Sequence, residues 1–162
     1  MSFELTEISG DLFSCPSDFS LAHCVSSDFS MSKGIAVEFK KRFQRVGQLR
    51  AQGNEKKTST EMFVNERKFF LDAPVGGCAF LKDENHFIFY LVTKTKYFHR
   101  PTMNSLENSL IRMRDLCVEN GVSKLAMPRI GCGLDRLRWD VVCPLIRKIF
   151  QDTTIEIRIY LG

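Results

Sequence analysis

Residues 87–92, Phe-Ile-Phe-Tyr-Leu-Val, are apolar at six consecutive positions. A strand of this kind is buried on both faces, which is typical of a parallel sheet covered by helices on each side. The run is far shorter than the roughly 20 residues that a membrane-spanning helix needs. Because strand-like and helix-like segments alternate along the chain, the sequence predicts an α/β domain with a mostly parallel sheet covered on both faces.

The other strands and helices are predicted from apolar periodicity and from turn residues. Strands are expected at residues 3–8, 20–25, 123–130 and 155–162, with two more on either side of the turn signal at 83–85. Helices are expected at residues 34–43, between Thr102 and Gly121, and at 140–150. Thr102 is the expected cap of the second helix, and Pro144 should delay the start of the third helix or kink it.

The composition is typical of one soluble globular domain: of 162 residues, 44% are hydrophobic and 26% are charged. The N-terminus, MSFELTEISG, lacks the basic and apolar regions of a signal peptide, so the sequence predicts an intracellular protein. The net charge of +4 is compatible with a polyanionic ligand but does not require one.

Six cysteines, none in a close C-x-x-C pair, are expected to be reduced thiols rather than metal ligands or disulfides. His23 is expected to be a core histidine with satisfied hydrogen bonds. His99 lies in the basic stretch KTKYFHR, which could contact nucleic acid or be a solvated turn. Neither histidine has a serine or cysteine partner at an informative spacing, so no triad, metal site or cofactor is predicted.

The stretch RIGCGLD, Arg129–Asp135, lies between a predicted strand and a predicted helix. Its two glycines permit positive φ and allow backbone N–H groups to face an anion, as in a phosphate-binding loop. The same residues also suit a plain turn. The pattern is neither G-x-x-x-x-G-K-[ST] nor G-x-G-x-x-G, which disfavours a nucleoside triphosphatase or a dinucleotide oxidoreductase. Loops after the strands at 3–8 and 20–25 are candidates for the other walls of one pocket.

Four motifs occur in the order found in macrodomains, the ADP-ribose-binding modules: GDLF, SLAHCVSSDFSMSKGIAVEFKKRF, YLVTK and MPRIGCGLDRL. Over nearly its whole length the chain resembles the macrodomain branch of terminal ADP-ribose protein glycohydrolases and O-acetyl-ADP-ribose deacetylases. The resemblance implies a single macrodomain over residues 1–162, with a three-layer α/β/α fold and a central mixed, mostly parallel sheet. Residues 58–74 match nothing in that branch and are predicted to be an insertion.

The resemblance also implies where ADP-ribose binds. Asp11 would accept a hydrogen bond from the adenine amino group, Leu12 would line the adenine pocket, and Tyr160 would lie near the adenosine. Two loops would enclose the diphosphate and the distal ribose. Their implied substrate-binding residues are Ser26, Met31, Ser32, Gly34 and Ile35 in the first loop, and Arg129, Ile130, Gly131, Cys132, Gly133 and Leu134 in the second. On the residues alone, Asp11 would be a turn residue and Tyr160 a packing residue.

Catalysis is assigned by the resemblance to Lys94 and Asp135. Lys94 would attack C1″ of the distal ribose, displace the linked carboxylate and form a covalent lysyl adduct, and Asp135 would support the proton transfers. A lysine at the end of an apolar strand can be partly desolvated, which disfavours its charged form, whereas a neighbouring carboxylate favours that form. On the residues alone, Lys94 would be a solvated strand-end lysine and Asp135 a helix cap.

The first predicted function is removal of mono-ADP-ribose from glutamate or aspartate side chains, together with deacylation of O-acetyl-ADP-ribose. The alternatives are a non-catalytic ADP-ribose reader and a phosphatase acting on ADP-ribose 1″-phosphate.

Ser32-Lys33 stands where the resembled branch has a glycine-alanine pair, in the loop over the distal ribose. The expected partners are ADP-ribose and ADP-ribosylated proteins, and further candidates are ADP-ribosylated nucleic acid and poly(ADP-ribose). No membrane partner is expected. A monomer in the nucleus and cytoplasm is expected.

Overall fold

The computed structural model describes residues 3–27, 35–43, 74–96, 99–132 and 135–162. These residues form one six-stranded sheet. In spatial order its strands are β1 (Glu4–Ile8), β6 (Glu156–Tyr160), β5 (Lys124–Pro128), β2 (Ser20–Ser26), β4 (His86–Lys94) and β3 (Cys78–Asp83). Neighbouring strands run parallel except β3, which pairs antiparallel with β4. The predicted mixed, mostly parallel sheet is confirmed.

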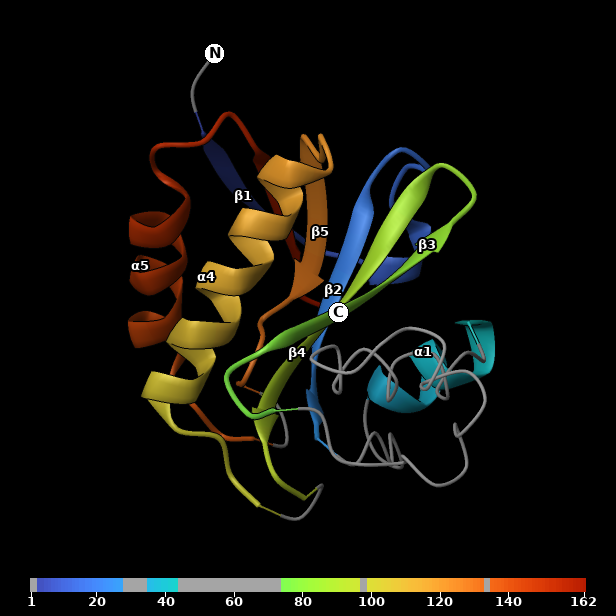
Figure 1. Cartoon of the computed structure of the whole chain (residues 1–162). Helices are drawn as coiled ribbons and strands as arrows, with labels where there is room; N and C mark the ends of the chain where they lie inside the picture. Colours follow the sequence, from blue (N-terminus) through green and yellow to red (C-terminus); the bar gives the residue numbers. More distant parts are fainter. Residues whose placement is uncertain (1–2, 28–34, 44–73, 97–98, 133–134) are drawn as a thin grey trace.

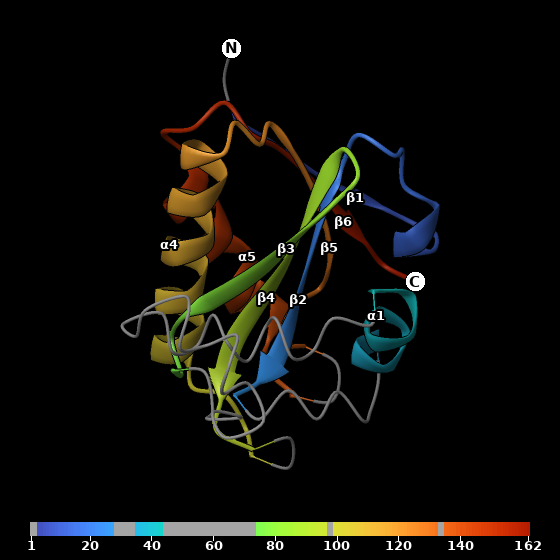
Figure 2. The ribbon, with the colours of Figure 1, turned by 45° about the vertical axis from the view of Figure 1, so that its right-hand side comes forward.

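Helices cover both faces of the sheet (Figures 1 and 2). Helices α4 (Met103–Glu119) and α5 (Trp139–Phe150) pack on one face, while α1 (Ile35–Phe43) and the short 3₁₀ helix η1 (Leu12–Ser14) lie on the other. The domain is therefore a three-layer α/β/α structure, as predicted.

Strand β4 supplies side chains to the hydrophobic cores on both sides of the sheet. Phe89 and Leu91 pack with α4 and α5, whereas Ile88, Tyr90 and Val92 pack with α1. All five side chains are at most 1% exposed. Because side chains alternate across a strand, an unbroken apolar run fills two cores at once, which explains why the sequence at 87–92 has no polar residue.

The ends of α4 match their predicted signals. Thr102 caps the helix through a capping box with Ser105, and the left-handed Gly121 (φ 70°) follows the C-cap.

Pro144 does not delay α5: the helix begins at Trp139 and continues through the proline. This part of the prediction is wrong, because apolar packing of the helix against the sheet outweighs the loss of one backbone donor. The predicted insertion at 58–74 lies outside the described residues except for Pro74.

His23, in the middle of β2, has no exposed surface. Its ring stacks on Phe39 with centroids 3.7 Å apart and meets the ring of Tyr90 edge-on at 4.9 Å. Within the described part of the chain, neither ring nitrogen has a hydrogen-bond partner. The core position is as predicted, but the expected hydrogen bonds are missing, because the imidazole is surrounded by aromatic rings that offer no acceptor.

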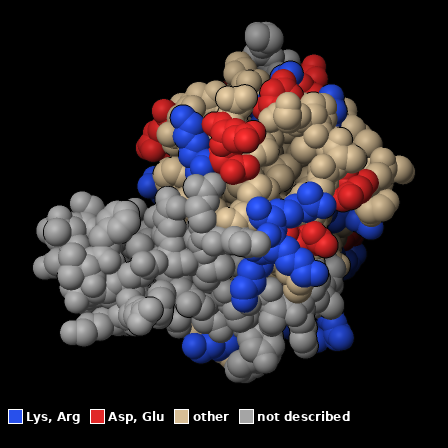
Figure 3. Space-filling view, turned by 90° about the vertical axis from the view of Figure 1, so that its right-hand side faces the viewer, with Lys and Arg blue, Asp and Glu red and all other residues tan. Residues whose placement is uncertain are grey.

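None of the described helices is long and apolar enough to cross a membrane. All six cysteines carry free thiols. In the described ranges, no group of three or more histidine, cysteine, aspartate or glutamate side chains could hold a metal ion. Figure 3 shows Lys and Arg side chains among acidic ones on the face that is turned toward the viewer. The ion pairs of the described residues include Asp18–Lys124 and Glu38–Arg42.

Candidate functional site

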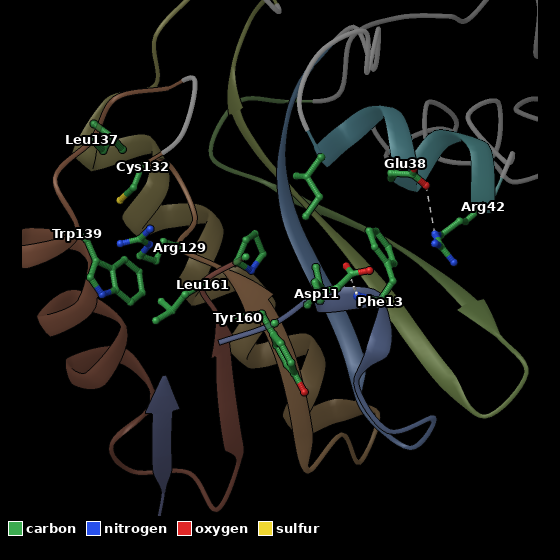
Figure 4. A pocket seen from close by; sticks show the side chains of 15 residues that line it. Asp11, Phe13, Glu38, Arg42, Arg129, Cys132, Leu137, Trp139, Tyr160 and Leu161 are labelled. Carbon is green, nitrogen blue, oxygen red and sulfur yellow. Dashed lines mark hydrogen bonds and ion pairs between the residues drawn. The ribbon is translucent and has the colours of Figure 1, made fainter. Parts of the chain in front are cut away.

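The five parallel strands end at one edge of the sheet, and the loops that follow them meet there. Beyond this edge lies a pocket of about 650 Å³. Its walls come from the loops after β1, β5 and β6, from α1 and from the start of α5 (Figure 4). This is the position at which open α/β sheets bind ligands. The sequence had predicted the loops after β1, β2 and β5 as walls of one pocket, and the loop after β2 lies mostly outside the described residues.

Four of the residues predicted to bind the substrate line one side of this pocket: Asp11, Leu12, Ile35 and Tyr160. Asp11 caps η1, since one carboxylate oxygen accepts from the backbone N–H of Phe13 at 3.1 Å. Its other oxygen has no partner among the described residues and can accept a further hydrogen bond. Asp11 is thus both the predicted turn residue and a usable acceptor in the pocket. Tyr160 is 7% exposed, so it contributes a wall that is itself packed in the core.

The loop after β5 is tightly closed. The backbone N–H of Leu137 donates to the carbonyl of Gly131 at 2.6 Å, which brings the two ends of the loop together. Gly131 (φ 73°) and Arg136 (φ 61°) both adopt left-handed backbone conformations. Arg129 and Cys132 line the pocket. Arg129 and Cys132 therefore face the pocket from a loop whose two ends are held together.

Ile130 occupies a different place from its neighbours in this loop. It is 2% exposed, and its side chain packs in the core under α4 and α5. Only its backbone can face a ligand, so its predicted role in substrate binding would have to be carried by main-chain atoms. Burial raises the pKa of the Cys132 thiol, which keeps this group neutral beside the pocket.

Gly131→Ala should destabilise the protein. A left-handed alanine costs about 1–2 kcal/mol, and the added Cβ would lie 2.9 Å from Cδ1 of Leu137, which must move. Gly121→Ala is the matched control, since it has nearly the same φ (70°) and nothing within 4 Å. We expect urea unfolding to show a larger loss of unfolding free energy for Gly131→Ala. Equal losses would mean that Leu137 does not hold the loop.

Lys94 and Asp135 form an ion pair: the lysine Nζ donates to Oδ1 of the aspartate. Both side chains are 12% exposed, so the pair is largely shielded from water. The two residues are 41 positions apart in sequence, and they meet because β4 and the loop after β5 end at the same edge. The predicted contact between an amine and a carboxylate is present. Neither residue lines the 650 Å³ pocket within the described parts of the chain.

The backbone around Lys94 is held from two sides. Ser27 donates its backbone N–H to the carbonyl of Lys94 at 2.8 Å and its hydroxyl to the carbonyl of Thr95 at 2.9 Å. From α4, the buried hydroxyl of Ser105 donates to the carbonyl of Thr93 at 2.7 Å. These bonds fix the strand end that carries the lysine. The predicted residue Ser26 is 3% exposed and is the β2 partner of Lys94, next to a register shift.

Cys24 lies behind the ion pair. Burial raises the pKa of its thiol to about 12, with the nearby Asp135 carboxylate acting in the same direction and Lys94 opposing it. The thiol is therefore neutral and unreactive.

Some predicted residues cannot be placed, and some pocket residues were missed. Met31, Ser32, Gly34, Gly133 and Leu134 lie outside the described residues, as does Lys33. The prediction missed Phe13, Glu38, Arg42, Leu137, Trp139 and Leu161, which all line the pocket. The helical period places Glu38 and Arg42 on one face of α1, which was an available signal. No local pattern indicated that Trp139 would reach the pocket.

Comparisons with known proteins show the family and the fold of this chain. No family model matches the chain. The human protein named ADP-ribose glycohydrolase OARD1 is 44% identical over 156 residues, which cover 96% of this chain and 90% of the human protein. The chain belongs to the OARD1 family. The predicted branch is therefore confirmed.

Solved structures identify the fold shared by this OARD1-family chain. The macrodomain of Thermus aquaticus DarG matches with a TM-score of 0.76 at 21% identity and covers 99% of each chain. Thermosipho africanus DarTG in complex with ADP-ribose matches with a TM-score of 0.73 at 23% identity, covering 98% of this chain and 42% of that one. At such identities the likeness concerns the fold alone, which is the predicted macrodomain.

Proposed function

We propose that this protein is a hydrolase that binds ADP-ribose and removes mono-ADP-ribose from acidic side chains of proteins. The observation that carries the proposal is the shielded ion pair of Lys94 and Asp135 at the ligand-binding edge of the sheet. It is supported by membership of a family whose human relative is named an ADP-ribose glycohydrolase. Thermosipho africanus DarTG, a solved structure with the same fold, is in complex with ADP-ribose, which is the ligand that we propose for this protein.

The ligand spans two regions of the site in this proposal. Adenine lies in the pocket, where the free oxygen of Asp11 accepts from its amino group. The diphosphate passes the loop that begins at Arg129, whose left-handed Gly131 leaves backbone N–H groups unobstructed by a side chain. The distal ribose then reaches the ion pair, with C1″ next to Lys94.

The reaction proceeds by displacement at C1″. Substrate entry separates Lys94 from Asp135, and the ammonium group of Lys94 releases one proton to water. The free amine attacks C1″ while the bond from C1″ to the acceptor oxygen breaks, and the acceptor leaves as a carboxylate. Asp135 takes the second proton from the lysine nitrogen and delivers it to the ring oxygen, so that the sugar ring opens to a Schiff base. Water adds to the Schiff-base carbon, and the C–N bond breaks to release ADP-ribose and the lysine amine. An acetyl group on the 1″ oxygen would be displaced as acetate by the same attack.

The ion pair separates this function from the alternatives. A non-catalytic reader has no use for a shielded amine and carboxylate at the distal ribose, because binding needs only the pocket and the loops. A phosphatase acting on the 1″-phosphate would attack phosphorus rather than carbon, and it would not form a carbon–nitrogen bond to Lys94. A covalent adduct on Lys94 therefore distinguishes the three functions.

The test compares acceptor linkages. Proteins carrying glutamate-linked or serine-linked mono-ADP-ribose, and DNA carrying base-linked ADP-ribose, are incubated with the protein, and free ADP-ribose is measured. We expect rapid release from glutamate, since a carboxylate is a better leaving group than an alkoxide. Tight ADP-ribose binding without release from any substrate would favour a reader. Release from DNA alone would contradict a protein substrate.

The same proposal includes the expected location of the protein in the nucleus and cytoplasm and its expected monomeric state.

A further inference from the structure

The pocket has two halves that differ in chemistry. Figure 4 shows Asp11, Phe13, Glu38 and Arg42 on one side of Tyr160, and Arg129, Cys132, Leu137 and Trp139 on the other. We call the second group, together with Leu161, the tryptophan arm. It lies where β1, β6 and β5 end and α5 begins.

The two arginines in the pocket differ in their partners. Arg42, on the adenine side, forms an ion pair with Glu38, with Nε and Oε2 3.3 Å apart. Arg129, in the tryptophan arm, is exposed, and its guanidinium has no ion pair or hydrogen bond within the described ranges. The arm therefore offers an available cation, whereas the adenine side is neutralised.

Trp139 gives the arm a fixed aromatic wall. Its Nε1–H donates to Oε1 of Glu7 at 2.9 Å, which ties the ring to the edge strand β1. Leu137, Cys132 and Leu161 add apolar surface. A rigid aromatic face beside a free guanidinium suits a ligand that is both anionic and partly apolar, such as a phosphorylated sugar or nucleotide.

The proposed position of ADP-ribose leaves the Trp139 side of this arm empty. The η1 helix that follows Asp11 contacts β5. From there the ligand runs toward Lys94 on β4, whereas Trp139 is tied to β1 on the opposite side of β5. The adenosine ribose is bonded to adenine and, through C5′, to the diphosphate. Only its 2′ and 3′ hydroxyls are free to carry a group into the arm.

We propose that the tryptophan arm binds a phosphate-bearing group attached to the adenosine ribose, with Arg129 as its cation and Trp139 as its wall. A 2′-phosphate and the next unit of an ADP-ribose polymer share this chemistry. The inference rests on the proposed function, since it takes the orientation of ADP-ribose from it. The rival explanation is that Arg129 serves the diphosphate of ADP-ribose itself.

The experiment compares the binding of ADP-ribose with that of ADP-ribose 2′-phosphate by calorimetry. Wild type should bind the 2′-phosphate about tenfold more tightly, the effect of one charge-assisted hydrogen bond. Arg129→Gln should abolish that preference, because it should lose more affinity for the 2′-phosphate than for ADP-ribose. Glu7→Gln keeps the acceptor for Trp139 and removes a negative charge, so it should increase the preference. Arg138→Gln is the matched control, because Arg138 is exposed, pairs with Asp140 and does not line the pocket.

Three results would overturn the inference. Equal or weaker binding of the 2′-phosphate by wild type would show that the arm takes no phosphate. Equal losses for both ligands in Arg129→Gln would assign Arg129 to the diphosphate. Failure to bind ADP-ribose at all would overturn the proposed function, and the subsite with it. Di-ADP-ribose binding, lost in Arg129→Gln, would identify the polymer rather than a 2′-phosphate as the source of the ligand.

Discussion

Replacing Lys94 with alanine should lower hydrolysis of glutamate-linked ADP-ribose by at least about 10³-fold, because the variant has no amine to attack C1″. Binding of ADP-ribose should change little, since the amine acts in the transition state and the pocket is lined by other residues. Single-turnover release of ADP-ribose measures the first effect, and calorimetry measures the second. Lys82→Ala is a suitable control, because Lys82 is exposed and pairs with Phe87 at the opposite end of β4.

Asp135→Ala should behave differently from Lys94→Ala. The lysine can still attack, but the proton transfers that resolve the adduct lose their carboxylate. Intact mass spectrometry should then show protein that has gained ADP-ribose, and peptide mapping should place it on Lys94. Wild-type rates in Lys94→Ala would exclude the covalent route. The absence of any adduct in an otherwise inactive Asp135→Ala would instead assign Asp135 to the first step.

A large effect on stability is expected at His23. Burial lowers the pKa of this histidine to about 3, whereas in the unfolded chain it is about 6.5. Between these two values the unfolded chain binds one proton more than the folded protein. Stability therefore falls as the pH falls through this window, by about 1.4 kcal/mol for each pH unit from this group alone.

His23→Phe should remove this pH dependence. The variant replaces an imidazole, whose nitrogens have no partner among the described residues, by an apolar ring of similar shape, stacked on Phe39. Urea unfolding at pH 6.5 and pH 5 should show wild type losing about 2 kcal/mol more than the variant. Each protein is compared with itself at two pH values. Any change in the free energy of unfolding that the larger phenylalanine ring causes at both pH values therefore cancels. His99→Gln, at an exposed site, should follow wild type. Parallel losses in wild type and His23→Phe would mean that His23 is protonated in the folded protein.

Much of the fold was predictable because it depends on local pattern. The apolar run at 87–92 became the doubly buried strand β4, and the turn signal at 83–85 became a hairpin whose Glu84 has a φ of 53°. Thr102 formed the expected cap. Periodicity and capping act between residues close in sequence, so the chain itself carries that information. Lys94 and Asp135 were different, since only their resemblance to a family motif singled them out.

The sequence by itself determined the elements, their caps, the family and the edge at which the loops gather. Only the tertiary structure decided which side chains meet. Trp139 reaches Glu7 across 132 positions, and His23 lies among rings, with no partner for its nitrogens in the part of the chain that the structure describes. The physical reason is that the strand order β1-β6-β5-β2-β4-β3 selects each residue's neighbours. Many strand orders are compatible with the same local pattern, and they differ only in the long-range packing that a single sequence does not display.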